Sequence, residues 1–214
     1  DEVEDIHKLL SRNDKSVSAL ASPLFKWYPD GIIRESLEKV DTFGFNPPLS
    51  LAEKQNYITK AIAVAKILKT QNVRIFSSLK ASSTKYSFTS DPLFEFALKE
   101  AQKENVTLLL ENEPPCYINR MSDIRLLAKK FASENLKLWF DVSNFYKIGG
   151  QVLLSDLKEL KNSIGYFHLK DFDEKGNYVA IGEGVINYKR IISDIKEIFG
   201  DTEIFLSLET HVRS

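Results

Sequence analysis

The segment VTLLLENE (Val106–Glu113) decides the fold of this 214-residue chain, because a run of aliphatic residues ends there in acidic ones. A short apolar run bounded by polar and turn residues is typical of a buried strand. Three later segments share this design: LKLWFDVSN (Leu136–Asn144), IGYFHLKD (Ile164–Asp171) and EIFLSLET (Glu203–Thr210). Each has an acidic or imidazole side chain near its end. We therefore expect strands whose C-terminal ends carry reactive groups.

The spacing of these groups fits repeated strand–helix units. Glu111 and Asp141 are 30 residues apart, Asp141 and His168 are 27 apart, and His168 and Glu209 are 41 apart. A strand, its crossover helix and the next parallel strand take roughly 30 residues. The last interval leaves room for an extra short strand, which we place at YVAIG (Tyr178–Gly182). The alternation predicts an α/β fold with a parallel sheet covered by helices.

Helices are expected where apolar stripes meet end signals. Ser50 and Glu53 have capping-box spacing before a helix from Leu51 to about Lys69. Further helices are expected at Ile32–Val40, from Asp91-Pro92 onward, at Ser122–Glu134, at Leu154–Leu160 and at Tyr188–Phe199, and further strands at Val17–Ser22 and Asn72–Ser78.

Period-two alternation indicates which way the strand faces point. In the last strand, Ile204, Leu206 and Leu208 share one face, and Glu209 lies on the other. We expect the aliphatic face to pack under helices. The mixed face would point into a barrel, where a polar group at the rim reaches solvent or a metal.

Composition excludes several classes of protein. The formal net charge of −1 offers no broad basic surface, so nucleic acid is not an expected partner. No apolar run approaches the roughly 20 residues that cross a bilayer, so we expect no membrane segment. Cys116 is the only cysteine, which rules out an intrachain disulfide and favours a cytoplasmic location.

Glu111, Asp141, His168 and Glu209 would together form an oxygen- and nitrogen-rich site for Mn²⁺, Mg²⁺, Co²⁺ or Zn²⁺. Ligands bind at the carboxyl ends of parallel strands, so we expect a divalent metal there. Such a metal polarises a carbonyl, and a nearby glutamate can take a proton from the adjacent carbon. Taken singly, each residue has a plainer interpretation: an acidic residue at a strand end often caps a helix, and His168 could be a core histidine.

The segments LLLENE, LWFDVSN, YFHLKD, IGEGVINY and LSLET resemble, in this order, the strand motifs of the xylose-isomerase-like TIM-barrel superfamily of sugar isomerases and epimerases. HLKD, the following G-E-G and the final glutamate are its most specific parts. The resemblance implies a TIM-type (β/α)8 barrel. Such barrels typically need about 250 residues, so we expect residues 1–214 to form a single, N-terminally incomplete domain that lacks the first β/α unit.

The resemblance further implies a metal-dependent sugar or sugar-phosphate isomerase or epimerase that transfers a proton through an enediolate. It implies four metal ligands, namely Glu111, Asp141, His168 and Glu209. Within that set Glu111 and Glu209 would double as the catalytic acid/base pair.

Substrate contacts are expected from three further residues, Glu113, Asn144 and Lys170. Asn144 stands in D-V-S-N where family members often carry a histidine that meets the substrate. An asparagine donates and accepts hydrogen bonds but does not ionise at neutral pH. For Lys170, an ion pair with Asp171 at the barrel rim is an equally weighted alternative.

Two other functions stay open at this stage. An abasic-site endonuclease of the same superfamily would use a multi-zinc cluster rich in histidine, whereas this chain has only His7, His168 and His211. A non-catalytic barrel that retains the fold is the other alternative. The particular sugar, the metal and assembly into a homo-oligomer also stay open.

Overall fold

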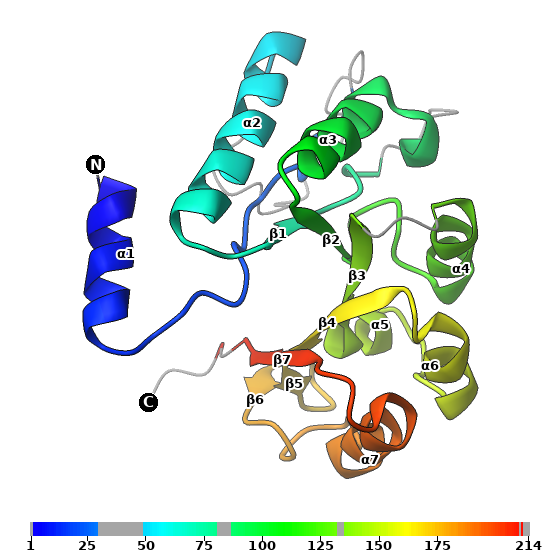
Figure 1. Cartoon of the computed structure of the whole chain (residues 1–214). Coiled ribbons are helices and arrows are strands. Elements are labelled where there is room, and N and C mark those ends of the chain that lie inside the picture. The colour runs from blue at the N-terminus through cyan, green and yellow to red at the C-terminus, as the bar shows by residue number, and fades with distance from the viewer. Residues whose placement is uncertain (1, 30–48, 81–86, 132–134, 210, 212–214) are drawn as a thin grey trace. The chain divides into compact units, whose positions relative to one another are not determined.

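The computed structural model of the protein describes residues 2–29, 49–80, 87–131, 135–209 and 211 (Figure 1). These residues fall into two compact units. The first consists of Asp1–Leu110, Pro115–Tyr117 and Ser133–Leu136, and the second of Glu111–Pro114, Ile118–Ala132 and Lys137–Ser214. The helix expected at Ile32–Val40 lies outside the described residues, and the expectation of one domain stays a prediction.

The first unit contains two parallel strands and their helices. Strand β1 (Asn72–Ile75) pairs with the first four residues of β2 (Thr107–Glu111), with Val73 opposite Leu108. The predicted parallel arrangement is therefore confirmed for this pair. The helices are α1 (Glu2–Arg12), α2 (Leu51–Ile67), the 3-10 helix η1 (Phe88–Ser90) and α3 (Pro92–Lys103).

The ends of α2 and α3 form where the sequence predicts them. Ser50 and Glu53 make the reciprocal capping box, with Ser50 N donating to Glu53 Oε2 at 2.8 Å. Asp91 caps α3 by accepting from Leu93 N at 2.8 Å, with Pro92 in the first turn. These contacts satisfy backbone N–H groups that have no partner inside the helix.

The strand predicted at Val17–Ser22 is wrong in extent. Only Leu20 pairs, in parallel with Val73, through Leu20 N to Asn72 O at 2.8 Å and Arg74 N to Leu20 O at 2.9 Å. The Ser22 hydroxyl then bonds the Arg74 carbonyl oxygen in place of a backbone donor. A serine side chain that competes in this way ends regular pairing.

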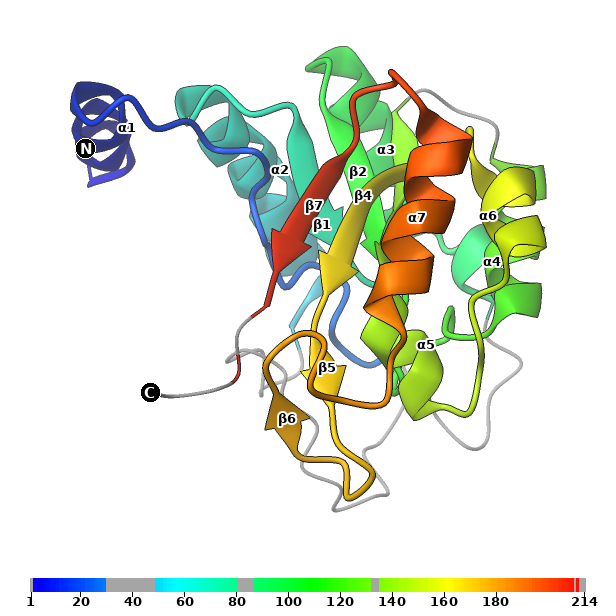
Figure 2. The same cartoon turned by 90° about the horizontal axis from the view of Figure 1, so that it is seen from below.

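The second unit contains a parallel sheet in the order β3, β4, β7. Strand β3 (Leu136–Asp141) belongs to this unit from Lys137 onward. Strand β4 (Ile164–Leu169) lies between β3 and β7 (Phe205–Leu208) and pairs with both. Figure 2 shows β4 and β7 side by side and pointing the same way. The other elements of this unit are α4 (Met121–Lys130), α5 (Val142–Lys147), α6 (Leu154–Leu160), the antiparallel pair β5 (Asp171–Phe172) and β6 (Tyr178–Val179), and α7 (Tyr188–Phe199).

An aromatic layer crosses this sheet directly below the polar strand ends. Trp139, Tyr166 and Phe205 are opposite one another in register, and their rings stack at centroid distances of 4.0 Å and 5.6 Å. Two residues further along, the same face carries Asp141 opposite His168. The register thus places Asp141 and His168 side by side, next to the layer of stacked aromatic rings.

One packing expectation for β7 is wrong. The aliphatic face should pack under helices, but Leu206 is 41% exposed and Leu208 is 65% exposed. Helix α7 packs against β4, where the rings of Phe199 and Phe167 meet edge to face at 5.8 Å. Its apolar stripe therefore covers the neighbouring strand and leaves these two leucines in contact with solvent.

The G-E-G segment is tied to the end of β4 by Asp171. The buried Asp171 carboxylate accepts backbone hydrogen bonds from Phe172 N at 2.9 Å, Gly182 N at 3.0 Å and Gly184 N at 3.1 Å. A Cβ at Gly184 would overlap Asp171 Oδ1 and the Phe172 carbonyl oxygen, which explains the glycine there. The loop after β6 is thus held close to the site-bearing strand.

This loop gives a stability test with a matched control. Asp171→Ala leaves the partly buried backbone N–H groups of Phe172, Gly182 and Gly184 without their acceptor, so we expect a loss of about 2–3 kcal/mol in the free energy of unfolding, measured with urea. Asp173→Ala removes the same kind of contact, to Lys175 N and Asn177 N, from an exposed turn where water can replace it. We expect the Asp173 variant to lose about 1 kcal/mol or less. Equal losses would contradict the role given to Asp171.

Candidate metal centre

Three buried side chains of the second unit converge at the strand ends. Glu111 ends β2, Asp141 ends β3 and His168 lies in β4, and one ligand atom from each lies within 4.8 Å of the other two. Nδ1 of His168 is 3.1 Å from Glu111 Oε1 and 3.4 Å from Asp141 Oδ2. The structure therefore brings three of the four expected ligands into one group, in the part of the chain that it describes.

Glu209, the fourth expected ligand, lies on the same side but one step further along. Leu169 is opposite Leu208, and Glu209 N donates to Leu169 O at 2.9 Å, so Glu209 is level with Lys170 and not with His168. Its Oε2 is 3.8 Å from His168 Nδ1. The side chain is 31% exposed, whereas that of Glu111 is 2% exposed. Glu209 thus adjoins the group of three from its open side.

Lys170 bridges the carboxylates of Asp141 and Glu209. Its buried ammonium nitrogen lies 2.9 Å from Asp141 Oδ2 and 2.5 Å from Glu209 Oε2. The alternative of an ion pair with Asp171 is wrong, because the Asp171 carboxylate binds backbone N–H groups. The Lys170 side chain therefore points toward the expected metal ligands.

Asp141 caps a helix and also faces the other expected ligands. Its Oδ1 accepts from Asn144 N at 2.6 Å and so caps α5, a short helix that the sequence analysis did not predict. Its Oδ2 faces His168 and Lys170. A helix cap and a ligand position are therefore compatible in one carboxylate.

Asn112 holds Asp141 in place and was missed from the sequence. Its side-chain amide donates to Asp141 O at 2.9 Å and accepts from Asp141 N at 2.8 Å. This amide replaces a pair of backbone ladder bonds between two strand ends. The available signal was its position between two glutamates, directly after a buried strand.

Two of the expected substrate-binding residues contact each other. Asn144 Nδ2 donates to Glu113 Oε2 at 2.8 Å and to Asn112 O at 3.1 Å. Asn144 is buried, in the first turn of α5. The contacts fix the Asn144 amide beside the cluster, with Glu113 at the same edge.

Burial and charge act against each other on these groups. Burial lowers the pKa of His168, but hydrogen bonds and charge from Asp141 and Glu111 outweigh it and raise the pKa to about 9. Burial raises the pKa of Asp141, but the hydrogen bond with His168 and the charge of Lys170 outweigh it, so that pKa is lowered. The pKa of Glu209 is also lowered, because Lys170 outweighs its burial. The cluster is thus stabilised as a set of charges.

His211 reaches the centre from the end of the chain, a contact that the sequence analysis did not assign. Its Nε2 lies 3.4 Å from Glu209 Oε2, and its ring stacks on Tyr178 of β6 at 4.1 Å. The Lys147 ammonium lies 3.6 Å from the centroid of the same tyrosine ring. These contacts connect Glu209 with the β5–β6 hairpin and the end of α5.

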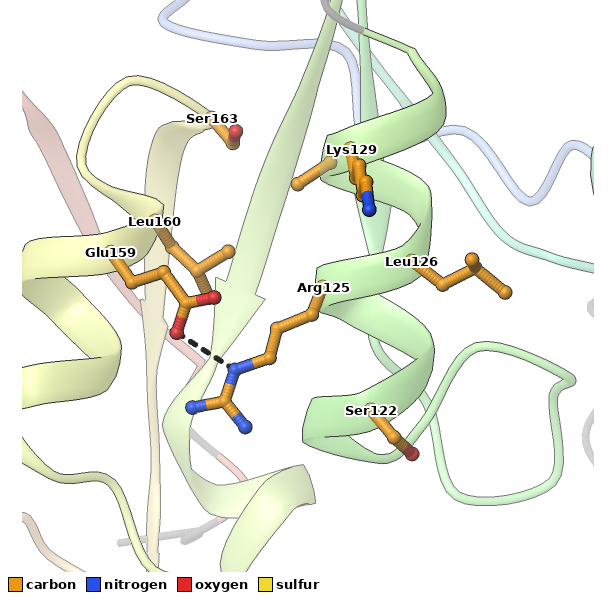
Figure 3. A pocket seen from close by; sticks show the side chains of 8 residues that line it. Ser122, Arg125, Leu126, Lys129, Glu159, Leu160 and Ser163 are labelled. Atoms are coloured by element: carbon orange, nitrogen blue, oxygen red, sulfur yellow. Dashed lines mark hydrogen bonds and ion pairs between the residues drawn. The ribbon is translucent and has the colours of Figure 1, made fainter.

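Two hollows of the second unit lie apart from the cluster residues. One, of about 520 Å³, is lined by α4 and α6, and Arg125 Nε and Glu159 Oε2 pair across it at 2.8 Å (Figure 3). The other, of about 690 Å³, is lined by the end of α5 and the β5–β6 turn, including Lys147 and Lys175. Neither is lined by an expected metal ligand, so the cluster remains the candidate site.

The donor set fits a divalent metal. Two carboxylates and an imidazole are ligands that Mn²⁺, Co²⁺ and Zn²⁺ share, and no thiolate is present to form a closed structural zinc site. Asp141 Oδ2 is fully buried and lies 2.9 Å from the Lys170 ammonium and 3.4 Å from His168 Nδ1, so this oxygen already faces cationic groups. The residues present are therefore suited to hold such an ion.

The family follows from comparison with known proteins. A family model described as xylose isomerase-like TIM barrel matches residues 1–214, and the chain belongs to this family. The TIM-barrel fold class predicted from the sequence is thereby confirmed. A comparison with curated protein sequences gives no match.

Several solved structures share this fold. The probable 3-DHS dehydratase AsbF from Bacillus anthracis is 18% identical with a TM-score of 0.71, over 98% of this chain and 75% of that one. The IOLI protein with a bound zinc atom is 19% identical with a TM-score of 0.73, over 98% and 72%. A D-tagatose 3-epimerase-like protein is 20% identical with a TM-score of 0.72, over 99% and 77%. At these identities the likeness shows the fold alone.

Among the described residues, no helix has the length and apolar character needed to cross a membrane.

The charge arrangement predicts an unusual histidine in the metal-free protein. In EDTA, NMR should show His168 titrating near pH 9 instead of 6.5, with His168→Gln identifying the resonance. Because the folded pKa is raised, the stability from the protonated ring should be fully present below pH 6.5 and lost as pH rises through about 9. A measured pKa of His168 at or below 6.5 would contradict the contacts of its ring with Glu111 and Asp141.

Proposed function

We propose that the protein is a metal-dependent sugar or sugar-phosphate isomerase or epimerase that moves a proton through an enediolate of its substrate. The observation that carries the proposal is the buried group of Glu111, Asp141 and His168 with Glu209 beside it. The family match supports the fold context for such a site. Sites of this kind lie at the carboxyl ends of barrel strands.

The protein groups divide into holding and proton-moving roles. When bound, a divalent metal would polarise the substrate carbonyl and so acidify the neighbouring C–H. Asp141 and His168 would hold it, with Asp141 fixed by Asn112 and by its bond to Asn144 N. These supports leave the two glutamates as the groups that can also move a proton.

Glu111 and Glu209 would act as acid and base at the substrate carbon. Glu111 is closed off from solvent, and Glu209 is 31% exposed. A substrate that enters from the open side would meet Glu209 first, with Glu111 behind it. One carboxylate would take the proton from the carbon, and the other, itself protonated from solvent, would donate its own proton to the opposite face, which changes the configuration at that carbon.

Substrate binding would come from the groups at the same edge. Asn144 and Glu113 already bind each other and can exchange that bond for substrate hydroxyls. Lys170 supplies a positive charge for a phosphate or a developing oxyanion. A substrate that fills the opening would also keep competing water from the reacting carbon.

Two other functions are alternatives to the proposed one, and experiment can distinguish them. An abasic-site endonuclease would need several metals, and the described residues contain one group of three such ligands. A non-catalytic barrel would keep the fold without turnover. Fold likeness does not separate them, because similar structures include both an L-ribulose 3-epimerase and an AP endonuclease, family 2, from Brucella melitensis.

The direct test uses a panel of ketoses, aldoses and their phosphates in D₂O with Mn²⁺. We expect turnover that EDTA abolishes and that places solvent deuterium on the substrate carbon. Glu111→Gln and Glu209→Gln should each lower kcat by about 10²–10⁴-fold. Glu174→Gln, in the exposed hairpin turn, is the matched control and should leave kcat unchanged.

The other outcomes of this experiment point elsewhere. Turnover without deuterium incorporation would indicate a hydride shift and reduce both glutamates to ligands. Nicking of abasic DNA would favour the nuclease. Protein that binds metal but turns over none of the panel and does not act on DNA would favour a non-catalytic barrel.

A further inference from the structure

The Lys170 ammonium contacts carboxylate oxygens of two of the expected metal ligands. It lies 2.9 Å from Asp141 Oδ2 and 2.5 Å from Glu209 Oε2. The same two oxygens face Nδ1 of His168, at 3.4 Å and 3.8 Å. One ligand nitrogen and one ammonium therefore share the same pair of carboxylate oxygens.

A divalent ion on those oxygens would lie within a few ångströms of the ammonium. Like charges a few ångströms apart repel strongly where water is largely excluded. Asp141 is fully buried and Lys170 is 6% exposed, so solvent screens this position poorly. A divalent ion held by Asp141 and Glu209 would have to displace the ammonium from them.

The backbone of Lys170 is fixed, whereas its charge lies at the end of a long side chain. Tyr188 Oη donates to Lys170 O at 2.6 Å, and Lys170 N donates to Tyr188 Oη at 3.3 Å. The residue also directly follows β4. The ammonium sits on a flexible four-carbon stem, so its release would need rotation of side-chain torsions and no movement of the backbone.

We propose that Lys170 is a resident cation of the centre, which competes with the divalent metal for Asp141 and Glu209 and is released when the metal binds. The inference rests on the proposed function only in that the cluster takes a metal. It adds that the protein weakens its own metal binding. It also adds that loading frees an ammonium at the mouth of the site, where an anionic substrate oxygen can use it.

The primary test measures Mn²⁺ affinity of the full chain by calorimetry. Lys170→Met keeps most of the apolar stem and removes the charge, so we expect Mn²⁺ to bind about tenfold more tightly than to the wild type, the size of one lost charge-assisted contact. Lys175→Met, in the exposed turn, removes the same charge away from the carboxylates and should leave the affinity unchanged. Unchanged or weaker binding by the Lys170 variant would overturn the proposal.

A second measurement needs no variant and covers the case in which Lys170→Met fails to fold. Wild-type protein is treated with acetic anhydride in EDTA or in saturating Mn²⁺, and lysine acetylation is read by mass spectrometry. Acetylation of Lys170 should rise on loading, while that of Lys158, on α6, stays constant. Acetylation of Lys170 that stays low with metal bound would show that it never leaves the carboxylates.

These outcomes separate the inference from the proposed function. If the variant binds Mn²⁺ and the wild type does not, competition is supported and the metal-dependent activity of the wild type fails. If both bind equally, competition fails and the proposed function stands. If neither binds, the cluster does not take the metal even without the ammonium, and competition is again overturned.

Discussion

The second unit depends on one electrostatic constraint: carboxylates gathered at strand ends need positive charge close by. Glu111 and Asp141 are almost fully buried, and Glu209 adjoins them. Like charges at this separation cannot all stay ionised unless cations or donors compensate them. Here the His168 ring and the Lys170 ammonium do so directly. The same requirement makes the cluster suited to a divalent ion.

The fold meets this constraint by fixing each carboxylate through its backbone. Strand register sets Asp141 opposite His168, above the stacked rings of Trp139 and Tyr166. The Asn112 amide holds the backbone of Asp141. Polar strand ends on a rigid aromatic floor are pre-organised, so a bound ion or substrate pays little to order them. Freedom is left mainly to the long side chains at the opening.

The sequence predicted those features that local patterns control. Alternating apolar runs located β3 and β4, and cap signals located α7 and the start of α2, because these depend on neighbours in the chain. Contacts between side chains of different strands could not be predicted from the sequence. Nothing in H-L-K-D tells whether Lys170 turns to Asp171 or to Asp141, and the exposure of Leu208 depends on where α7 packs. Asn112 was missed because its partner lies 29 residues away.

Anomalous diffraction from crystals grown with Mn²⁺ would show whether an ion binds at this cluster and where Lys170 then lies. We expect one strong peak bonded to Glu111, Asp141, Nδ1 of His168 and Glu209, with the Lys170 ammonium no longer on Asp141 or Glu209. A crystal that shows no peak at these residues, or a peak elsewhere with Lys170 still between Asp141 and Glu209, would contradict this expectation.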